Sequence, residues 1–443
     1  NASFSIIATG TGLTYQWRKG TTNLSNTGNI TGATTATLNL SNVATSDAGS
    51  YNVIVSGASP CSSVTSNAAT LLVNQAVAIS TQPISTQTLC TGNSVSFSTT
   101  ATGTGLTYQW RKGTTVLNNT GNITGATTST LTINPVVSAD AASDYNVVIT
   151  GTAPCTPVTS NNAALVINDA VVISTQPTST QTICSGTNAS FSVIATGTGL
   201  TYQWRKGTTN LSNTGNITGA TTATLNLSNV ATSDTGSYNV IVSGASPCSS
   251  LPSNGATLVV NQAVAISTQP ITTQTLCAGN SVSFSTTATG TGLTYQWRKG
   301  TTVLTNTGNI SGANTTTLTI NPVVSADAAS DYNVVITGTA PCTAVTSNNA
   351  ALVINDAVVI STQPAATQTI CSGTNASFSI IATGTGLTYQ WRKGTTNLSN
   401  TGNITGATTA TLNLSNVATS DAGSYNVIVS GASPCSSVTS NAA

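Results

Sequence analysis

Short runs in which apolar and polar residues alternate recur along the whole chain. In the run SVSFSTTA, Val95, Phe97 and Thr99 fall on one face of an extended segment, and in LTYQW the residues Tyr108 and Trp110 share a face. Alternation with a period of two predicts half-buried β-strands. Helical periodicity of useful length is missing throughout, so the sequence predicts an all-β protein.

Further runs between residues 75 and 168 extend this pattern. AVAISTQP and STQTLC are interpreted as one first strand in two pieces, and the runs STLTINPV, DYNVVITG and AALVIN follow Trp110. Gly, Asn and Thr occupy the segments between the runs, as is typical of turns. Several short strands in a segment of this length favour one β-sandwich domain.

The same strand pattern occurs five times. The stretch TGLTYQWRKGTT is repeated unchanged, and its tryptophan recurs at alternating intervals of 93 and 94 residues. The second and fourth repeats (type B) contain INPVVSADAASDYNVVITG, where the first, third and fifth (type A) contain NLSNVATSDAGSYNVIVSG or a close variant. A fixed period is the signature of a repeat protein. We therefore predict five domains in the order A-B-A-B-A, at residues 1–74, 75–168, 169–261, 262–355 and 356–443, of which the first lacks its first strand and the last lacks its last strand.

Charge and cysteine content narrow the possible functions. Charged residues make up 4% of the chain, the net charge is +1, and all cationic residues belong to the five Arg-Lys pairs of the repeated stretch. This charge gives no field that would attract nucleic acid, and no apolar run approaches the ~18 residues of a membrane helix. We therefore expect neither a nucleic-acid partner nor membrane insertion in this segment. Regularly spaced cysteines, of which there are nine, favour an oxidising, extracellular setting in a chain rich in Thr and Ser.

Residues suited to catalysis or metal binding are scarce. The chain contains no His, which removes the commonest general base and metal ligand, and no two cysteines have C-x-x-C spacing. Asp140 and Asp144, with their counterparts in the fourth repeat, could form an acid/base couple, but their position directly before a strand favours a turn. We predict a non-catalytic protein with no cofactor and no metal.

At the level of motifs, the repeats resemble immunoglobulin-like (Ig-like) domains. The stretch GNSVSF resembles strand B of that fold, the strand with Trp110 resembles strand C, and the stretch DAGSY that ends at Tyr51 resembles the tyrosine corner before strand F. The whole chain resembles the tandem Ig-like repeats of bacterial cell-surface proteins and adhesins, particularly those of Bacteroidota. This resemblance implies five Ig-like β-sandwiches in an elongated rod, located outside the cell at its surface.

The usual disulfide between strands B and F of Ig domains is absent here. Thr99 or Val193 stands at the strand B position, and Val147 or Val240 stands at the strand F position. We therefore expect each tryptophan to pack on aliphatic side chains in the core. The predicted core tryptophans are Trp17, Trp110, Trp204, Trp297 and Trp391, and the predicted corner tyrosines are Tyr51, Tyr145, Tyr238, Tyr332 and Tyr425.

Each complete repeat has one cysteine before strand B and one between strands F and G, and two pairings are possible. Pairing within a repeat would join Cys90 to Cys155, Cys184 to Cys248, Cys277 to Cys342 and Cys371 to Cys435. In the Ig layout, however, these two positions lie at opposite ends of the sandwich, roughly 25 Å apart, whereas a disulfide needs Cα atoms within about 7 Å. Pairing between repeats is therefore favoured, and it would join Cys90 to Cys248, Cys184 to Cys342 and Cys277 to Cys435, with Cys61, Cys155 and Cys371 awaiting partners beyond this segment.

The Arg-Lys pair that follows each tryptophan is a possible surface contact. Arg18 is expected to point outward from its strand and Lys19 to begin the following turn. The pairs would then form one basic spot per repeat, for an anionic surface polymer or a neighbouring filament, although simple solvation of the strand end is the plainer interpretation. The residues are Arg18, Lys19, Arg111, Lys112, Arg205, Lys206, Arg298, Lys299, Arg392 and Lys393.

Three functional hypotheses follow. The first is a structural or adhesive extracellular stalk or fibre, stiffened by disulfides. The second is a subunit of a polymeric surface filament or sheath, assembled by strand donation or lateral contacts. The third is an array of carbohydrate-binding modules, which would need exposed aromatic side chains. Accordingly, the partners considered are other copies of this chain, a surface polymer or a glycan.

Overall fold

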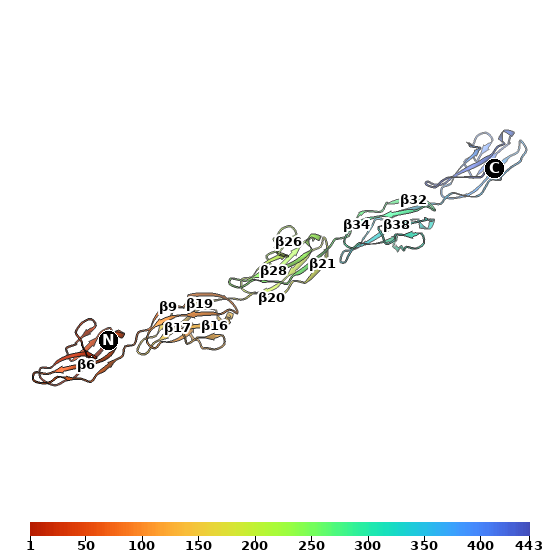
Figure 1. Ribbon diagram of the computed structural model, residues 1–443. Coiled ribbons are helices and arrows are strands. Elements are labelled where there is room, and N and C mark those ends of the chain that lie inside the picture. Colours follow the sequence, from red (N-terminus) through yellow and green to blue (C-terminus); the bar gives the residue numbers. More distant parts are fainter. The chain divides into compact units, whose positions relative to one another are not determined.

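The computed structural model describes residues 1–443 and consists of β-strands, five short 3-10 helices and no α-helix. Figure 1 shows the strands grouped into successive β-sandwiches along the chain. The chain forms two compact units: the first contains Asn1–Gln176, Val193–Gln203 and Val240–Ser253, and the second contains Pro177–Ser192, Trp204–Asn239 and Asn254–Ala443. An all-β fold of five Ig-like sandwiches in tandem is thus confirmed.

The second repeat illustrates the sandwich. One sheet has the strand order β10-β19-β17-β13-β14 with β18 attached to β17, and the other has the order β11-β16-β15, while β9 pairs with β12. The bounds are β9 Ala78–Thr81, β10 Thr86–Cys90, β11 Val95–Ser98, β12 Thr100–Thr102, β13 Thr107–Lys112, β14 Thr115–Val116, β15 Ile123–Thr124, β16 Thr130–Ile133, β17 Ala142–Thr150, β18 Val158–Thr159 and β19 Ala163–Asn168.

Most pairings are antiparallel, but β10 runs parallel to β19. Their register aligns Thr86 with Ala164 at one end and Cys90 with Asn168 at the other. The first strand is therefore split as expected, with β9 on one sheet and β10 on the other. This parallel pairing places Cys90 beside the last residue of the repeat, at the end that faces the following residues of the chain.

The third and fourth repeats follow the same plan. Their sheets have the orders β21-β30-β28-β24-β25 and β32-β41-β39-β35-β36. The bounds are β21 Thr180–Cys184, β24 Thr201–Lys206, β25 Thr209–Asn210, β28 Gly236–Ser243, β30 Ala256–Asn261, β32 Thr273–Cys277, β35 Thr294–Lys299, β36 Thr302–Val303, β39 Ala329–Thr337 and β41 Ala350–Asn355.

The first and fifth repeats have fewer strands. In the first, β8 (Ala69–Leu71) pairs with β6 (Gly49–Ser56), and no strand corresponds to β10. In the fifth, β42 (Val359–Thr362) is present and β49 (Tyr425–Ser430) pairs with β45 (Thr388–Lys393), but no strand corresponds to β19. A groove in this repeat is lined by Phe378, Leu414 and Tyr425 among others. The exact limits of the five repeats stay a prediction.

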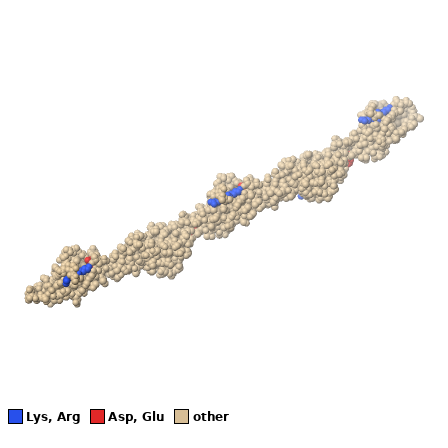
Figure 2. Space-filling model, in the orientation of Figure 1, with Lys and Arg blue, Asp and Glu red and all other residues tan.

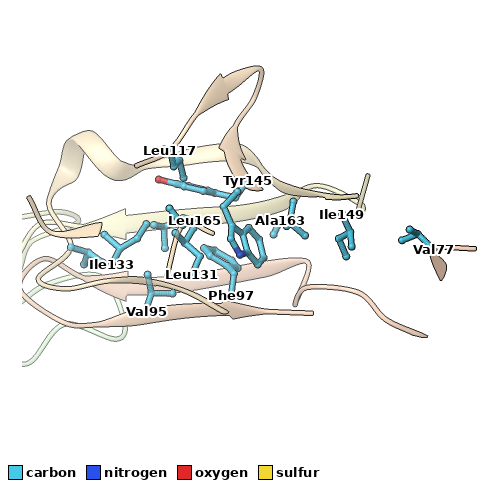
Figure 3. Packing of buried hydrophobic residues seen from close by; sticks show 14 residues of the cluster. Val77, Val95, Phe97, Leu117, Leu131, Ile133, Tyr145, Ile149, Ala163 and Leu165 are labelled. Atoms are coloured by element: carbon cyan, nitrogen blue, oxygen red, sulfur yellow. The ribbon is translucent and has the colours of Figure 1, made fainter. Parts of the chain in front are cut away.

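The core of each repeat lies between its two sheets. In β11 the burial alternates, and Val95 and Phe97 are buried while the serines that follow them are exposed. Figure 3 shows Phe97, Tyr145 and Leu131 gathered between the strands. The rings of Phe97 and Tyr145 stack with centroids 5.3 Å apart, and Trp110 lies 6.4 Å from Phe97 in a tilted arrangement.

All five tryptophans belong to these cores, with side chains no more than 3% exposed. The Trp110 indole Nε1 donates a hydrogen bond to the Thr128 carbonyl over 2.9 Å, which satisfies its one polar group inside the core. In register, Trp110 faces Val147 on β17. Aliphatic packing thus occupies the place of the usual B–F disulfide. The equivalent indole bonds of Trp17, Trp297 and Trp391 are also 2.9 Å long.

The corner tyrosines close the turn before each long strand. Tyr145 donates from its hydroxyl to the Asp140 carbonyl over 2.7 Å. Asp140 ends the 3-10 helix η2 (Ser138–Asp140), and its carboxylate accepts hydrogen bonds from the Val137 amide and from Asn122 Nδ2. The Asp residues of these turns are therefore structural. The same hydroxyl bond is made by Tyr51, Tyr238, Tyr332 and Tyr425.

Candidate functional site: the junctions between repeats

The junctions between successive repeats bring together side chains that are far apart in the sequence. At the junction of the second and third repeats, Cys90 ends β10 and Asn168 ends the adjacent β19. Cys248 lies in the loop that follows β28. Because β10 and β19 end together, both can reach this loop of the next repeat.

Three disulfides join successive repeats. Cys90 bonds Cys248, Cys184 bonds Cys342 and Cys277 bonds Cys435, and in each pair the Cα atoms are 5.1 Å apart. These are the pairs that the Ig layout favoured over pairing within a repeat. Each disulfide links residues separated by 158 positions in the sequence.

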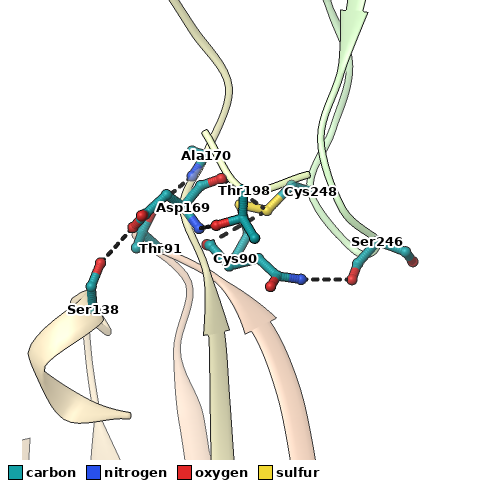
Figure 4. The surroundings of a disulfide bond; sticks show 9 residues. Cys90, Thr91, Ser138, Asp169, Ala170, Thr198, Ser246 and Cys248 are labelled. Carbon is teal, nitrogen blue, oxygen red and sulfur yellow. Dashed lines mark hydrogen bonds between the residues drawn. A yellow bond between two sulfur atoms is a disulfide. The ribbon is translucent and has the colours of Figure 1, made fainter. Parts of the chain in front are cut away.

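Hydrogen bonds surround the first disulfide, as Figure 4 shows. Asn168 Nδ2 donates to the Ser246 carbonyl over 2.9 Å, next to Cys248 in the loop of the third repeat. The Asp169 amide donates to Thr198 Oγ1 over 2.8 Å. The Asp169 carboxylate in turn accepts a hydrogen bond from Ser138 Oγ of the second repeat. Asp169, which lies in the short linker between Asn168 and Val172, is therefore hydrogen-bonded to both neighbouring repeats.

The next two junctions repeat these contacts. Asn261 donates to the Ala340 carbonyl and Asn355 donates to the Ser433 carbonyl, both over 2.9 Å. At each junction the amide of the residue after this Asn donates to a Thr hydroxyl over 2.8 Å. Three junctions thus share one arrangement of a disulfide, an Asn side chain and a Thr side chain.

Packing is also close at the junctions. A Cβ atom added at Gly244 would lie 3.0 Å from Val171 Cγ2 of the linker and 3.3 Å from the Thr198 carbonyl oxygen. Glycine at the start of this loop therefore lets the linker valine approach the loop backbone. A side chain at this position would clash with Val171 and with the Thr198 backbone, beside the disulfide.

The junction of the first and second repeats has the same contacts without a disulfide. Asn74 Nδ2 donates to the Ala153 carbonyl over 2.9 Å, and Cys155 Sγ lies 3.6 Å from the Gln75 carbonyl oxygen. Cys155 is a free thiol here, whereas its counterparts Cys248 and Cys342 are bonded. Cys61 and Cys371 are also free, and both are exposed.

The lysines of the Arg-Lys pairs stand where a strand meets a turn. Lys112 ends strand β13 and begins the tight turn to β14, where it pairs with Thr115, and its Nζ donates to the Ala139 carbonyl of η2 over 2.8 Å. The same ammonium lies 5.9 Å from the centre of the Tyr145 ring. A strand residue at this position can reach across to the 3-10 helix because the two adjoin the same corner. Lys19, Lys206, Lys299 and Lys393 make the equivalent hydrogen bond.

The arginines are partly buried and not simply directed into solvent. In the third repeat, Arg205 Nε donates to Asn210 Oδ1 over 2.8 Å, and Arg392 makes the same bond in the fifth repeat. In the first repeat, Arg18 Nε instead donates to the Thr21 carbonyl. In type B repeats valine replaces this asparagine, and the buried Nε atoms of Arg111 and Arg298 have no hydrogen-bond partner. Figure 2 shows the few basic side chains as isolated spots on a face that is otherwise almost uncharged. Whether these spots contact another molecule stays a prediction.

Burial shifts the ionisation of the corner tyrosines. It raises the pKa of the Tyr145 phenol to about 12, and the nearby Asp140 and Asp144 carboxylates add to this rise. The pKa of Tyr238 and that of Tyr332 rise to about 12 for the same reasons. These groups stay neutral in the core at neutral pH.

The chain offers few side chains for a metal site or for a sugar-binding surface. No group of three or more Cys and Asp side chains is placed to hold a metal ion, and the chain contains no helix that could cross a membrane. With every tryptophan buried, the aromatic side chains left near the surface are the half-buried tyrosines that precede them by two residues, such as Tyr108, and the half-buried Phe4.

Sequence reasoning missed the asparagines at the junctions. Asn168, Asn261 and Asn355 end the last strand of their repeats, and Asn74 lies three residues after the end of β8. Each of the four donates to the loop of the next repeat. The chain does contain a signal for them. Asn stands at this position in both repeat types, although the residue that follows it changes between Gln and Asp.

Comparison with solved structures finds tandem Ig domains. A three-domain fragment from the I-band of titin has a TM-score of 0.51 and 19% sequence identity, and the match covers 64% of this chain and 99% of the fragment. A Glu-to-Ala variant of the three-domain titin structure has the same TM-score and identity and covers 63% and 99%. Immunoglobulin domains 1–5 of Sidekick-1 match with a TM-score of 0.35 and 16% identity, over 99% of this chain and 93% of that one. At these identities the likeness concerns the fold alone.

No curated protein matches the sequence. One family model does match, and its description is "Domain of unknown function (DUF8696)". It covers residues 2–75, 174–262 and 360–443, which together exceed half of the chain and correspond to the type A repeats. The chain therefore belongs to the DUF8696 family, as a tandem array of Ig-like domains.

Proposed function

We propose that this chain is part of a non-catalytic extracellular stalk or fibre, in which Ig-like repeats are held together by covalent bonds between neighbours. The observation that carries the proposal is the set of disulfides from Cys90 to Cys248, Cys184 to Cys342 and Cys277 to Cys435. Disulfides inside one domain mainly stabilise that domain. Disulfides between domains instead limit how neighbouring domains move, which is useful to a load-bearing or reach-extending structure.

The chemistry supports a location outside the cytoplasm. Disulfides persist in oxidising compartments, whereas cytosolic thiols are kept reduced. The surface carries very little charge, with 4% charged residues and a net charge of +1. Repulsion and attraction between repeats are therefore weak, and salt should have little effect on the structure. Both properties suit a fibre that is exposed to a variable medium.

The location can be tested on the cells that produce the protein. Antibodies against this segment should label intact cells, and a membrane-impermeant thiol reagent, applied to intact cells after mild reduction, should modify Cys184 and Cys342. Cys184 should react only after reduction, which provides an internal control. Labelling that requires lysis, together with cysteines that all react without reduction, would contradict an extracellular fibre.

The stiffening effect can be tested in solution. Small-angle scattering of the oxidised chain should give a narrower distribution of sizes than scattering of the reduced chain. The double variant C184S/C342S should lie between them, because it lacks one of the three bridges. Equal distributions in all three samples would mean that the disulfides do not restrict the motion between repeats.

A polymeric surface filament is the second candidate, and two thiols favour it. Cys371 follows the same stretch of sequence as the bonded Cys184, and Cys61 lies in the loop of the first repeat that is equivalent to the loop of the bonded Cys248 in the third. A further repeat with an equivalent cysteine, on this or another chain, could continue the series of bridges. Gel electrophoresis without reductant should then show multimers that the C371S variant no longer forms. Monomers alone would argue against covalent filaments of this segment.

A further inference from the structure

The three disulfides overlap one another along the sequence. Each spans 158 positions, which is longer than one repeat. The loop closed by Cys90 and Cys248 therefore contains Cys184, and the loop closed by Cys184 and Cys342 contains Cys277. Overlap of this kind has a mechanical effect that separate disulfides within single domains do not have.

We infer that the disulfides form a covalent load path that carries tension past most of the chain and limits its extension. When the chain is pulled at residues 1 and 443, the shortest covalent route crosses from Cys90 to Cys248 and later from Cys277 to Cys435. Only residues 1–90, 248–277 and 435–443 lie on this route. The segments between Cys90 and Cys248 and between Cys277 and Cys435 form closed loops that bear no tension, so a stretching force cannot straighten them.

The loops contain the cores of four repeats. Trp110 and Trp204 lie between Cys90 and Cys248, and Trp297 and Trp391 lie between Cys277 and Cys435. Trp17 is the one core tryptophan that remains on the loaded route. Strong tension should therefore unfold the first repeat and detach strands such as β30, which lies on the route and carries the buried Leu258. The strands that carry the tryptophans of the other four repeats lie off the route and should not be drawn out.

The disulfides greatly shorten the length to which the chain can be stretched. At about 3.4 Å per residue, the route of the oxidised chain extends to roughly 430 Å, whereas the whole backbone would extend to roughly 1,500 Å. The oxidised chain is thus about 3.5-fold shorter at full extension. Pairing within each repeat would instead give a limit of roughly 630 Å, because more of the backbone would stay on the route.

The middle disulfide, Cys184 to Cys342, lies off this shortest route and acts as a reserve. If the bond from Cys90 to Cys248 is lost, the route runs along the chain to Cys184, crosses to Cys342 and returns to Cys277. The limit then rises only to roughly 870 Å. One broken bridge therefore lengthens the chain without releasing all of it.

Single-molecule pulling of the whole chain tests this inference. Handles are attached by enzymatic ligation at the two ends, after the free thiols of Cys61, Cys155 and Cys371 have been alkylated. The oxidised chain should reach a contour length near 430 Å, and dithiothreitol, which is oxidised as it reduces each disulfide to two thiols, should raise it to near 1,500 Å. An oxidised contour length near 630 Å, or one that dithiothreitol does not change, would overturn the inference.

Two variants supply matched controls. C184S/C342S should keep the contour length near 430 Å, since the middle bridge is off the route, whereas C90S/C248S should extend to near 870 Å. The opposite order would overturn the inference. Contour length at full extension depends on crosslinks and not on folding, so a destabilised variant still gives a reading. The inference rests on the structural role proposed above, but the pulling experiment measures only the crosslinks. If the contour lengths differ from those expected, the proposed extracellular location is unaffected. If the protein is found inside the cell, the measured contour lengths are equally unaffected.

Discussion

Trp110 combines packing and hydrogen bonding at one buried position. Its side chain is fully buried against Phe97 and faces Val147, and its indole nitrogen is bonded to the Thr128 carbonyl. Removal of a buried aromatic side chain loses both the apolar contacts and the space they filled. A single residue of this kind therefore carries a sizeable part of the stability of its repeat.

Trp110→Ala should destabilise the second repeat by about 3–5 kcal/mol. Hydrogen exchange of the full chain, followed by mass spectrometry of peptides from residues 95–150, would measure the loss locally. Val116→Ala is a suitable control because Val116 is 46% exposed, and exposed substitutions usually change stability by less than about 0.5 kcal/mol. Unchanged protection in the Trp110 variant would mean that this side chain is not central to the core.

The corner tyrosines predict a loss of stability in alkali. In the unfolded chain tyrosine ionises near its ordinary pKa of 10.0, whereas the folded state holds Tyr145, Tyr238 and Tyr332 neutral up to about pH 12. The stability that comes from these raised pKa values is complete below pH 10 and declines as the pH rises toward 12. Near-ultraviolet circular dichroism and phenolate absorbance, recorded together, should change in this window.

A matched variant isolates the effect. Substitution of Phe for Tyr145, Tyr238 and Tyr332 removes the groups that ionise and should flatten the decline above pH 10, at the cost of their hydroxyl bonds at neutral pH. An identical alkaline transition in the variant would assign the transition to other groups. With no His in the chain, no imidazole contributes a transition between pH 5 and 8.

At the scale of elements, the alternating runs predicted the strands well. Val95, Phe97 and Thr99 are all buried, as the period of two required. Period and turn residues also located the split first strand, because both are local properties of the sequence. The role of Lys112 could not be read in this way, since its hydrogen bond joins β13 to the 3-10 helix η2, 27 positions away. Alternation fixes the face on which a residue lies but not its distant partner.

Lys112→Met should weaken the corner of the second repeat. Methionine keeps most of the apolar stem but loses the hydrogen bond to the Ala139 carbonyl and the position over the Tyr145 ring. We expect a local loss of about 1–2 kcal/mol, measured by hydrogen exchange in peptides that contain η2. Thr115→Ala, on an exposed edge strand, is the control. Equal effects of both substitutions would show that the lysine does not hold this turn.

For the whole molecule, the sequence left two sets of cysteine pairs open. The repeat period and the spacing of the cysteines are compatible with both. The outcome depends on the parallel pairing of β10 with β19, which brings Cys90 to the end of its repeat, and on the linker contacts of Asn168 and Asp169. Such arrangements depend on three-dimensional packing and not on the local pattern of residues.

Trypsin offers a direct check of the disulfide pairs, because all its cleavage sites lie in the five Arg-Lys pairs. Digestion of the denatured, unreduced chain, with free thiols alkylated, should give two crosslinked species. One contains the peptides from residues 20–111, 207–298 and 394–443, and the other contains those from 113–205 and 300–392. Pairing within repeats would instead leave all five peptides in one species, so a single large product would contradict the structure.

The overlap of the disulfide loops also determines what happens when a peptide bond of the chain is cleaved. Every peptide bond between Cys90 and Cys435 lies inside at least one loop. Hydrolysis of any one of them leaves both pieces attached to each other. The stretch between Cys248 and Cys277 is enclosed only by the middle bridge, from Cys184 to Cys342, so this bond alone keeps the two halves together after a cut there. An array that is cut once between Cys90 and Cys435 would keep its full set of repeats until a second cut or the reduction of a disulfide.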